Sequence, residues 1–176
     1  MRSVLSKEFF NKPTVLVAEQ LLGMYLVVRS QEREIAYIIT ETEAYDGHDD
    51  KASHASKGRT SRTEIMFGPA GVWYVYLIYG MYWMLNIVTG EIEYPAAVLI
   101  RGVENINGPG KLTREYSITK RYNGMHVDKK TGLWIEDRGV RIDYQNILRT
   151  ERVGVQYAGH LWANKPYRFI LKSHTE

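Results

Sequence analysis

Glu-Ile-Ala-Tyr-Ile-Ile-Thr-Glu-Thr-Glu-Ala-Tyr, residues 34–45, determines the fold class because it alternates with the two-residue period of a β-strand. A regular strand would place one set of alternate side chains on a single face: Ile35, Tyr37, Ile39, Glu41, Glu43 and Tyr45. An apolar strand that ends in two carboxylates buries charge, which costs several kcal/mol unless the charge is paired or used. The pattern leaves two interpretations open, a solvated strand end and a functional site.

The segments around this strand are mostly β-rich as well. Further strands are expected at 24–28, 72–78, 84–88, 96–103, 133–135, 152–155 and 167–171. A helix is expected at 14–22 after Pro13, a short one after Ser61 because Glu64 completes a capping box, and another from Gly108. The pattern predicts one α+β domain over residues 1–176. Its mostly antiparallel, curved sheet has flanking helices and a protruding aromatic hairpin.

Composition narrows the class of protein. The chain has 176 residues and a formal net charge of +3. It contains no cysteine, which excludes disulfides and metal centres held by thiolates. No signal peptide or membrane-spanning run is visible, so we expect a protein that is not secreted, cytoplasmic and nucleoid-associated in a bacterium or nuclear in a eukaryote. Thirteen tyrosines and four tryptophans suit the stacking of unpaired bases, or equally the edges of a sheet.

Residues 46–60 form a polar, glycine-containing loop directly after the two glutamates. Imidazole and carboxylate groups in this loop could bind a divalent metal: His48, Asp49, Asp50 and His54. Their spacing matches no familiar ligand set, so no metal site is expected.

The hairpin at 72–88 has an aromatic tip at Tyr79. Core packing explains one face of its strands, but a tyrosine at the tip can instead enter a base stack. The stretch Gly108-Pro109-Gly110-Lys111 is typical of a helix start that holds a phosphate, with Lys111 as the nearby cation, although it is also a plain turn.

Taken together, these segments resemble the alkyladenine (3-methyladenine) DNA glycosylase family. Matching stretches follow the family's order over nearly the whole chain. They are ETEAY (41–45), ASH (52–54), MF (66–67), YVYLIYGMY (74–82), Asn86, VLIR (98–101), GPGKL (108–112), RVG (152–154) and KPYRF (165–169). The segment 156–162 departs from the pattern by one extra residue, and no role is assigned to it.

The resemblance implies a role for each matching position. Glu43 is the glutamate that deprotonates the attacking water, and Arg101 and the carbonyl of Val153 help to hold that water. Glu41 is expected to be structural. The walls of the pocket for the flipped base are Tyr45, His54 and Tyr76, with Asn86 obstructing the amine of normal guanine. Tyr79 enters the duplex, and Met66 lies beside the lesion on the DNA-facing surface.

This resemblance implies a monofunctional enzyme of base excision repair. It acts on duplex DNA with damaged purines, namely 3-methyladenine and 7-methylguanine, with hypoxanthine and ethenoadenine left open, and leaves an abasic site. No cofactor, membrane or obligate protein partner is expected, and we expect a monomer. Three other functions stay open: a non-catalytic nucleic-acid-binding module, a metal-dependent nuclease, and a nucleoside hydrolase for small molecules.

Overall fold

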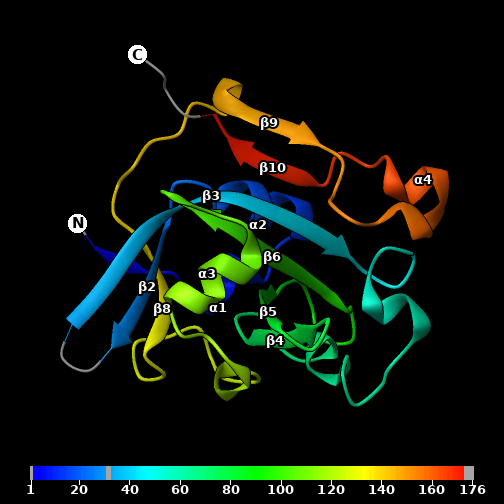
Figure 1. Cartoon of the computed structure of the whole chain (residues 1–176), viewed down its shortest axis with the longest axis horizontal. Coiled ribbons are helices and arrows are strands. Elements are labelled where there is room, and N and C mark those ends of the chain that lie inside the picture. Colours follow the sequence, from blue (N-terminus) through cyan, green and yellow to red (C-terminus); the bar gives the residue numbers. More distant parts are fainter. Residues whose placement is uncertain (1, 31–32, 173–176) are drawn as a thin grey trace.

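Strand β3 (Arg33–Asp46) lies at the middle of an antiparallel sheet in the computed structural model, which describes residues 2–30 and 33–172. The strand order through the main path is β1-β8-β2-β3-β6-β5-β4. Strand β10 is a third partner of β3, beside β2 and β6, and it also pairs with β9. Short helices lie around this sheet (Figure 1). The predicted α+β class with a mostly antiparallel sheet is therefore confirmed.

The described residues contain ten strands, four α-helices and five 3₁₀ helices. The strands are β1 (Ser3–Val4), β2 (Tyr25–Ser30), β3 (Arg33–Asp46), β4 (Trp73–Ile78), β5 (Tyr82–Val88), β6 (Ala96–Val103), β7 (Ile106–Asn107), β8 (Leu133–Asp137), β9 (Ile147–Thr150) and β10 (Arg168–Leu171). The helices are α1 (Lys7–Phe10), α2 (Thr14–Gln20), α3 (Pro109–Glu115) and α4 (Gly159–Ala163), with η1 (His54–Lys57), η2 (Glu64–Phe67), η3 (Lys120–Tyr122), η4 (Tyr144–Asn146) and η5 (Gln156–Ala158).

The alternation along β3 is interrupted at its centre. The register against β6 shifts between Ile39 and Glu41 and again before Thr42, as in a β-bulge. As a result Ile39 and Ala44, which a regular strand would place on opposite faces, both belong to the main hydrophobic core. The expected single face from Ile35 to Tyr45 is therefore wrong, because one extra residue exchanges the two faces.

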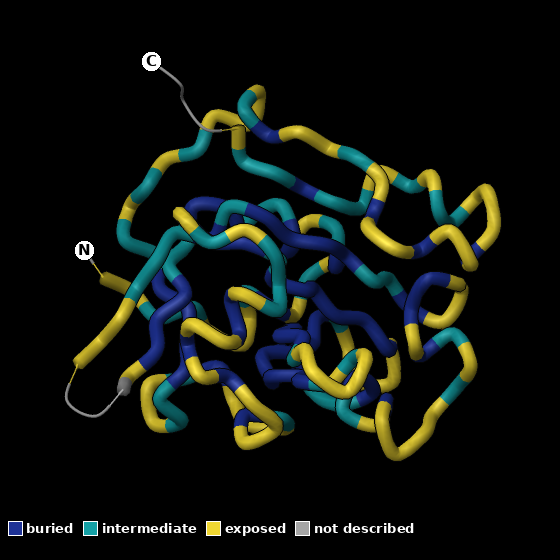
Figure 2. Tube along the Cα trace, viewed as in Figure 1, coloured by how far each residue is buried: buried dark blue, intermediate teal, exposed yellow. Residues whose placement is uncertain are grey.

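Helix α2 covers the core side of β3. Val17, Ala18 and Leu21 are fully buried, and the hydroxyl of Thr42 donates a hydrogen bond to the carbonyl of Ala18 at 2.7 Å. Thr42 and Ala44 thus face the core, which leaves Glu41 and Glu43 on the other side of the strand. Figure 2 shows these buried stretches at the centre of the molecule, with exposed loops around them.

The hairpin of β4 and β5 ends in a two-residue turn. Tyr79 and Gly80 have φ angles of 50° and 67°, and the Met81 N–H donates to the Ile78 carbonyl at 3.1 Å. Positive φ at both central residues is the mark of a type I′ turn, which suits the twist of paired strands. A tyrosine with positive φ is strained, and such strained residues are often found at functional sites. The Tyr79 side chain is 84% exposed.

Two local predictions were wrong. Residues 152–155 form a turn around Gly154 and not a strand; the strand of this region is β9, which ends at Thr150. The expected capping box of Ser61 and Glu64 is absent, because η2 begins at Glu64, whose carboxylate binds Arg59 instead. Within residues 2–30 and 33–172, the helices are all too short or too polar to cross a bilayer.

Candidate active site

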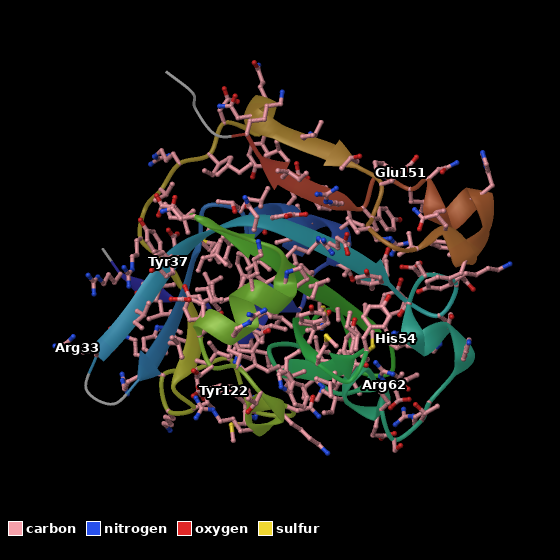
Figure 3. The ribbon with its side chains drawn as sticks, in the orientation of Figure 1. Arg33, Tyr37, His54, Arg62, Tyr122 and Glu151 are labelled. Atoms are coloured by element: carbon pink, nitrogen blue, oxygen red, sulfur yellow. The ribbon has the colours of Figure 1, made fainter. Side chains whose placement is uncertain are left out.

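A cavity of about 560 Å³ opens where β3, β6, β5 and β4 meet the loop after β3 and the turn after β9. Its volume lies in the range of small-molecule sites and is sufficient for a purine. Its walls are mostly aromatic and apolar, with a few polar groups. The lining residues used below are Tyr45, His54, Arg62, Met66, Tyr76, Tyr79, Asn86, Arg101 and Val153. Figure 3 labels His54 and Arg62 on this side of the molecule.

The sheet register explains why distant residues meet here. Glu43 pairs with Leu99, Leu99 with Asn86, and Asn86 with Tyr74, so one row of residues crosses four neighbouring strands. Directly paired residues lie on the same face of a sheet, and neighbouring strands are about 4.8 Å apart. Glu43 and Asn86 are therefore roughly 10 Å apart along this row, with Leu99 between them.

Glu43 is fully buried beneath this cavity. Its Oε1 accepts a hydrogen bond from the Val153 N–H at 2.7 Å and its Oε2 accepts one from the Tyr45 hydroxyl at 2.8 Å. Nε of Arg101 lies 3.5 Å from Oε1. These three neighbours line the cavity, and Glu43 lies behind them, in contact with each of the three. Val153 contacts Glu43 through its N–H, whereas the role predicted from the sequence concerned its carbonyl.

Burial is the main influence on the pKa of Glu43. Desolvation raises this pKa above 4.5, while Arg101, the Val153 N–H and the Tyr45 hydroxyl oppose the rise. A carboxylate with a raised pKa is a stronger base than an ordinary glutamate, and hydrogen-bond donors such as these favour its ionised form. Perturbed carboxylates of this kind concentrate in active sites.

Glu41 has different partners from Glu43. Its Oε1 accepts hydrogen bonds from Nε of Arg101 at 2.9 Å and from Nε of Arg168 at 2.6 Å. Two guanidinium groups thus neutralise Glu41, and Arg101 lies between the two glutamates. This arrangement agrees with a structural Glu41 that orients Arg101.

Aromatic rings form the cavity wall. The rings of His54 and Tyr76 are 4.8 Å apart edge to face, and the guanidinium carbon of Arg62 lies 4.9 Å from the Tyr76 ring. Burial raises the pKa of Tyr45 and of Tyr76, whereas burial together with the charge of Arg62 lowers the pKa of His54. All three side chains are therefore neutral at pH 7.

The remaining predicted residues lie at different depths. Asn86 is 2% exposed, and its Nδ2 donates to the carbonyls of Tyr74 and Met84, which fixes the amide and leaves Oδ1 as its acceptor. Met66 was expected on the DNA-facing surface, but it is 2% exposed and lines the cavity wall. The reason is that η2 directs its side chain inward, where it packs in a small hydrophobic cluster with Tyr74. Lys111 is exposed on the first turn of α3.

Three of the four candidate metal ligands have separate surroundings, and the fourth, Asp49, is exposed. Asp50 is fully buried against Arg152, His48 Nε2 lies 3.1 Å from the Glu93 carbonyl, and His54 lies in the cavity wall. Among the described residues, no three histidine, aspartate or glutamate side chains are grouped to hold a metal ion.

The pairing of Arg152 with Asp50 was not predicted from the sequence. They are 102 residues apart, and nothing local in either segment indicates that they meet. Arg62 was not predicted either, because its position depends on the path of the loop over Tyr76. Tyr74 could have been found, because it alternates with Tyr76 on the face of the hairpin that lines the cavity.

Comparisons with known proteins point to one family. The model of the methylpurine-DNA glycosylase (MPG) family matches residues 8–107 and 103–175. The chain is similar to proteins named "Putative 3-methyladenine DNA glycosylase" in three organisms: Methanocella arvoryzae (44% identity; 97% of this chain and 93% of the relative), Bdellovibrio bacteriovorus (41%; 97% and 96%) and Rickettsia felis (45%; 96% and 93%). With matches over almost its whole length, the chain belongs to the methylpurine-DNA glycosylase family.

Proposed function

We propose that this protein is a monofunctional DNA glycosylase that releases alkylated purines from duplex DNA and leaves an abasic site. The observation that carries this proposal is the buried Glu43, held by two hydrogen-bond donors behind the floor of a purine-sized aromatic cavity. The names of the relatives agree with it.

The cavity wall suits a cationic base. Methylation at N3 or N7 gives the purine a positive charge, and such a ring gains roughly 0.5–2 kcal/mol from contact with an aromatic face. Tyr45 and Tyr76 offer neutral faces, and His54 carries no charge at pH 7. Proposed substrates are therefore 3-methyladenine and 7-methylguanine, with the neutral hypoxanthine and ethenoadenine as a second class to compare.

The proposed chemistry is hydrolysis at the sugar carbon. Glu43 accepts a proton from water, the water oxygen bonds to C1′, and the N-glycosidic bond breaks with its electron pair leaving on the purine. A cationic purine becomes neutral in this step and needs little acid assistance. Arg101 and the carbonyl of Val153 are proposed to hold the water, and the Glu43 carboxylate also stabilises the positive charge that develops on the sugar.

Duplex DNA is the proposed partner, bound by a monomer. A base can reach Glu43 only after rotation out of the helix, which leaves a gap in the stack. Tyr79 lies at the rim of the cavity and is 84% exposed, so it is placed to fill that gap. Lys111 is proposed to contact a phosphate, since α3 begins beside the cavity at Pro109.

The direct test is incubation with methylated DNA without added metal, followed by chromatography of the freed bases. We expect release of 3-methyladenine and 7-methylguanine that a chelator does not reduce. Tight binding without release would indicate a binding module, loss of activity with chelator a metal-dependent nuclease, and equal cleavage of free nucleosides a nucleoside hydrolase.

Replacing Tyr79 with alanine should impair action on duplex DNA far more than on single strands. The loss of one stacked ring is worth about 1–3 kcal/mol, which corresponds to a roughly 5- to 150-fold drop in base release from the duplex. Tyr144→Ala, at an exposed tyrosine outside the cavity lining, is the control. Equal losses on both substrates would argue against insertion of Tyr79.

Borohydride should trap no covalent adduct with damaged DNA. Among residues 2–30 and 33–172, those that line the cavity include no lysine that could form an imine with the opened sugar. The expected product is an abasic strand that stays intact until it is treated with alkali, measured on a denaturing gel. A trapped complex, or strand cleavage that accompanies base release, would contradict a water-only mechanism.

A further inference from the structure

Arg152 and Asp50 form a buried ion pair beside the candidate site, and neither residue has been given a role above. The side chains of Arg152 and Asp50 are both 0% exposed. Arg152 binds Asp50 through both terminal nitrogens, with Nη2 2.8 Å from Oδ1. The two oxygens of Asp50 also accept the backbone N–H groups of Asp46 and Ala52 at 3.0 and 3.1 Å. The pair therefore fastens the loop after β3 to the turn after β9.

Arg152 also contacts two further segments. Its Nη1 donates to the carbonyl of Ala44 at 2.8 Å, and its Nη2 donates to the carbonyl of Trp162 in α4 at 3.2 Å. Its guanidinium carbon lies 4.9 Å from the Tyr45 ring. One side chain thus joins the end of β3, the loop after β3, the turn after β9 and α4.

These contacts surround the hydrogen bonds of Glu43. Ala44, whose carbonyl Arg152 holds, lies between Glu43 and Tyr45 in the chain. Val153, the next residue after Arg152, donates its N–H to Glu43 at 2.7 Å. Both donors to the carboxylate, the Val153 N–H and the Tyr45 hydroxyl, are therefore attached to backbone that Arg152 anchors.

We infer that Arg152, locked by Asp50, is a positioning residue that holds the Val153 N–H and Tyr45 in place against the Glu43 carboxylate. The inference rests on the proposed function, because it concerns the same general base. It also predicts a measurable property of Glu43 that does not depend on catalysis. Release of the Val153 N–H removes a donor that favours the ionised carboxylate, so Glu43 should protonate at higher pH.

The other charged and titratable groups around Glu43 are not themselves altered by a substitution of Arg152. Arg101 faces it from β6, Glu41 lies on its own strand, and the hydroxyls of Tyr76 and Tyr157 approach from β4 and η5. A change in the titration of Glu43 on substitution of Arg152 alone therefore reports on Arg152 and on the contacts that it anchors.

Two substitutions separate geometry from charge. Arg152→Lys keeps the positive charge but loses the two-pronged contact, and Arg152→Met loses both.

In the first assay the amide of Val153 is followed by NMR as pH is lowered, since an N–H that binds a carboxylate reports its protonation. In the second, the acid limb of the pH profile of base release from methylated DNA is measured. Arg138→Lys is the matched control, because Arg138 pairs with the buried Glu136 at β8.

We expect both Arg152 variants to move the midpoint of the acid limb up by about 1 pH unit and to reduce or abolish the Glu43 titration at the Val153 amide. Arg138→Lys should change neither. A shift in Arg152→Met alone would mean that only the charge matters, and lower thermal stability without any shift would mean a purely structural pair. Either result would overturn the inference.

Two safeguards keep the outcome decisive. If Arg152→Met fails to fold, Arg152→Met combined with Asp50→Leu replaces the pair by apolar groups of similar size, an exchange that buried ion pairs often tolerate. The NMR assay needs no substrate. If the wild-type protein released no base, the proposed function would fail while the Val153 titration still decided the role of Arg152.

Discussion

Glu43→Gln should abolish base release while leaving DNA binding nearly unchanged. Loss of a general base lowers rates by about 10²–10⁴-fold, and the same carboxylate also stabilises charge on the sugar. Glutamine has the same shape as glutamate, so its oxygen can accept the Val153 N–H and its amide can donate to the Tyr45 oxygen. Single-turnover release from methylated DNA and binding to a duplex with an abasic-site analogue measure the two effects.

The control for this substitution lies on the same strand. Glu34→Gln removes an exposed carboxylate from β3 at the far end from the cavity, and it should leave base release unchanged. Turnover by Glu43→Gln within a few-fold of the wild-type rate would remove Glu43 from the catalytic role.

Because the pKa of Glu43 is raised, we expect two pH-dependent effects. Base release should fall as pH drops through this pKa, above the ordinary value of 4.5, because only the carboxylate accepts a proton. The pKa of Glu43 is higher in the folded protein than in the unfolded chain, so its ionised carboxylate lowers the free energy of unfolding at pH values above the raised pKa. This loss of stability disappears as the pH falls through the raised pKa and the carboxyl group becomes protonated. Glu43→Gln should therefore unfold at a higher temperature than the wild type near pH 7, with a smaller difference near pH 4.

Asp50→Asn should cause the largest loss of stability among single polar substitutions near the site. The change leaves the fully buried guanidinium of Arg152 without its counter-ion, and breaking a buried pair in this way costs about 3–5 kcal/mol. For a chain of this length that corresponds to a fall of roughly 10 °C in Tm. Urea unfolding followed by circular dichroism measures the change in the free energy of unfolding.

A surface ion pair provides the comparison for Asp50. Glu64→Gln breaks the contact with Arg59, in which the side chains are 57% and 40% exposed, and such pairs contribute about 0–1 kcal/mol. If the two substitutions had equal effects, the Arg152–Asp50 pair would be open to solvent in solution. Recovery of stability by the apolar double replacement would show instead that the unpaired charge causes the loss.

Most elements of the fold were predictable because each depends on a short stretch of chain. The strand at 96–103 was predicted with its observed bounds, and the hairpin tip at Tyr79-Gly80 was expected from its flanking β-rich runs. The prediction failed at 152–155, where Gly154 at φ 74° makes a turn and Arg152 folds inward to a partner far along the chain. A β-rich pattern cannot report such a contact.

The residues named from the family motifs gather at one place, but their roles are still proposals. Tyr45, His54, Tyr76 and Asn86 all line the same cavity, and Glu43 lies behind its floor. The depth of Met66 was not predictable from its motif, because it depends on how η2 packs against Tyr74.

By itself the sequence determined what depends on neighbouring residues: the strand that carries Glu41 and Glu43, the aromatic hairpin, the helix start at Gly108 and, through its motifs, the family. Only the tertiary structure decided which of the two glutamates accepts the arginine hydrogen bonds. Glu41 receives Arg101 and Arg168, while Glu43 receives an N–H from Val153, 110 residues away. The physical reason is that burial and partner choice depend on the pairing of strands, and these contacts between distant residues set the pKa of a carboxylate.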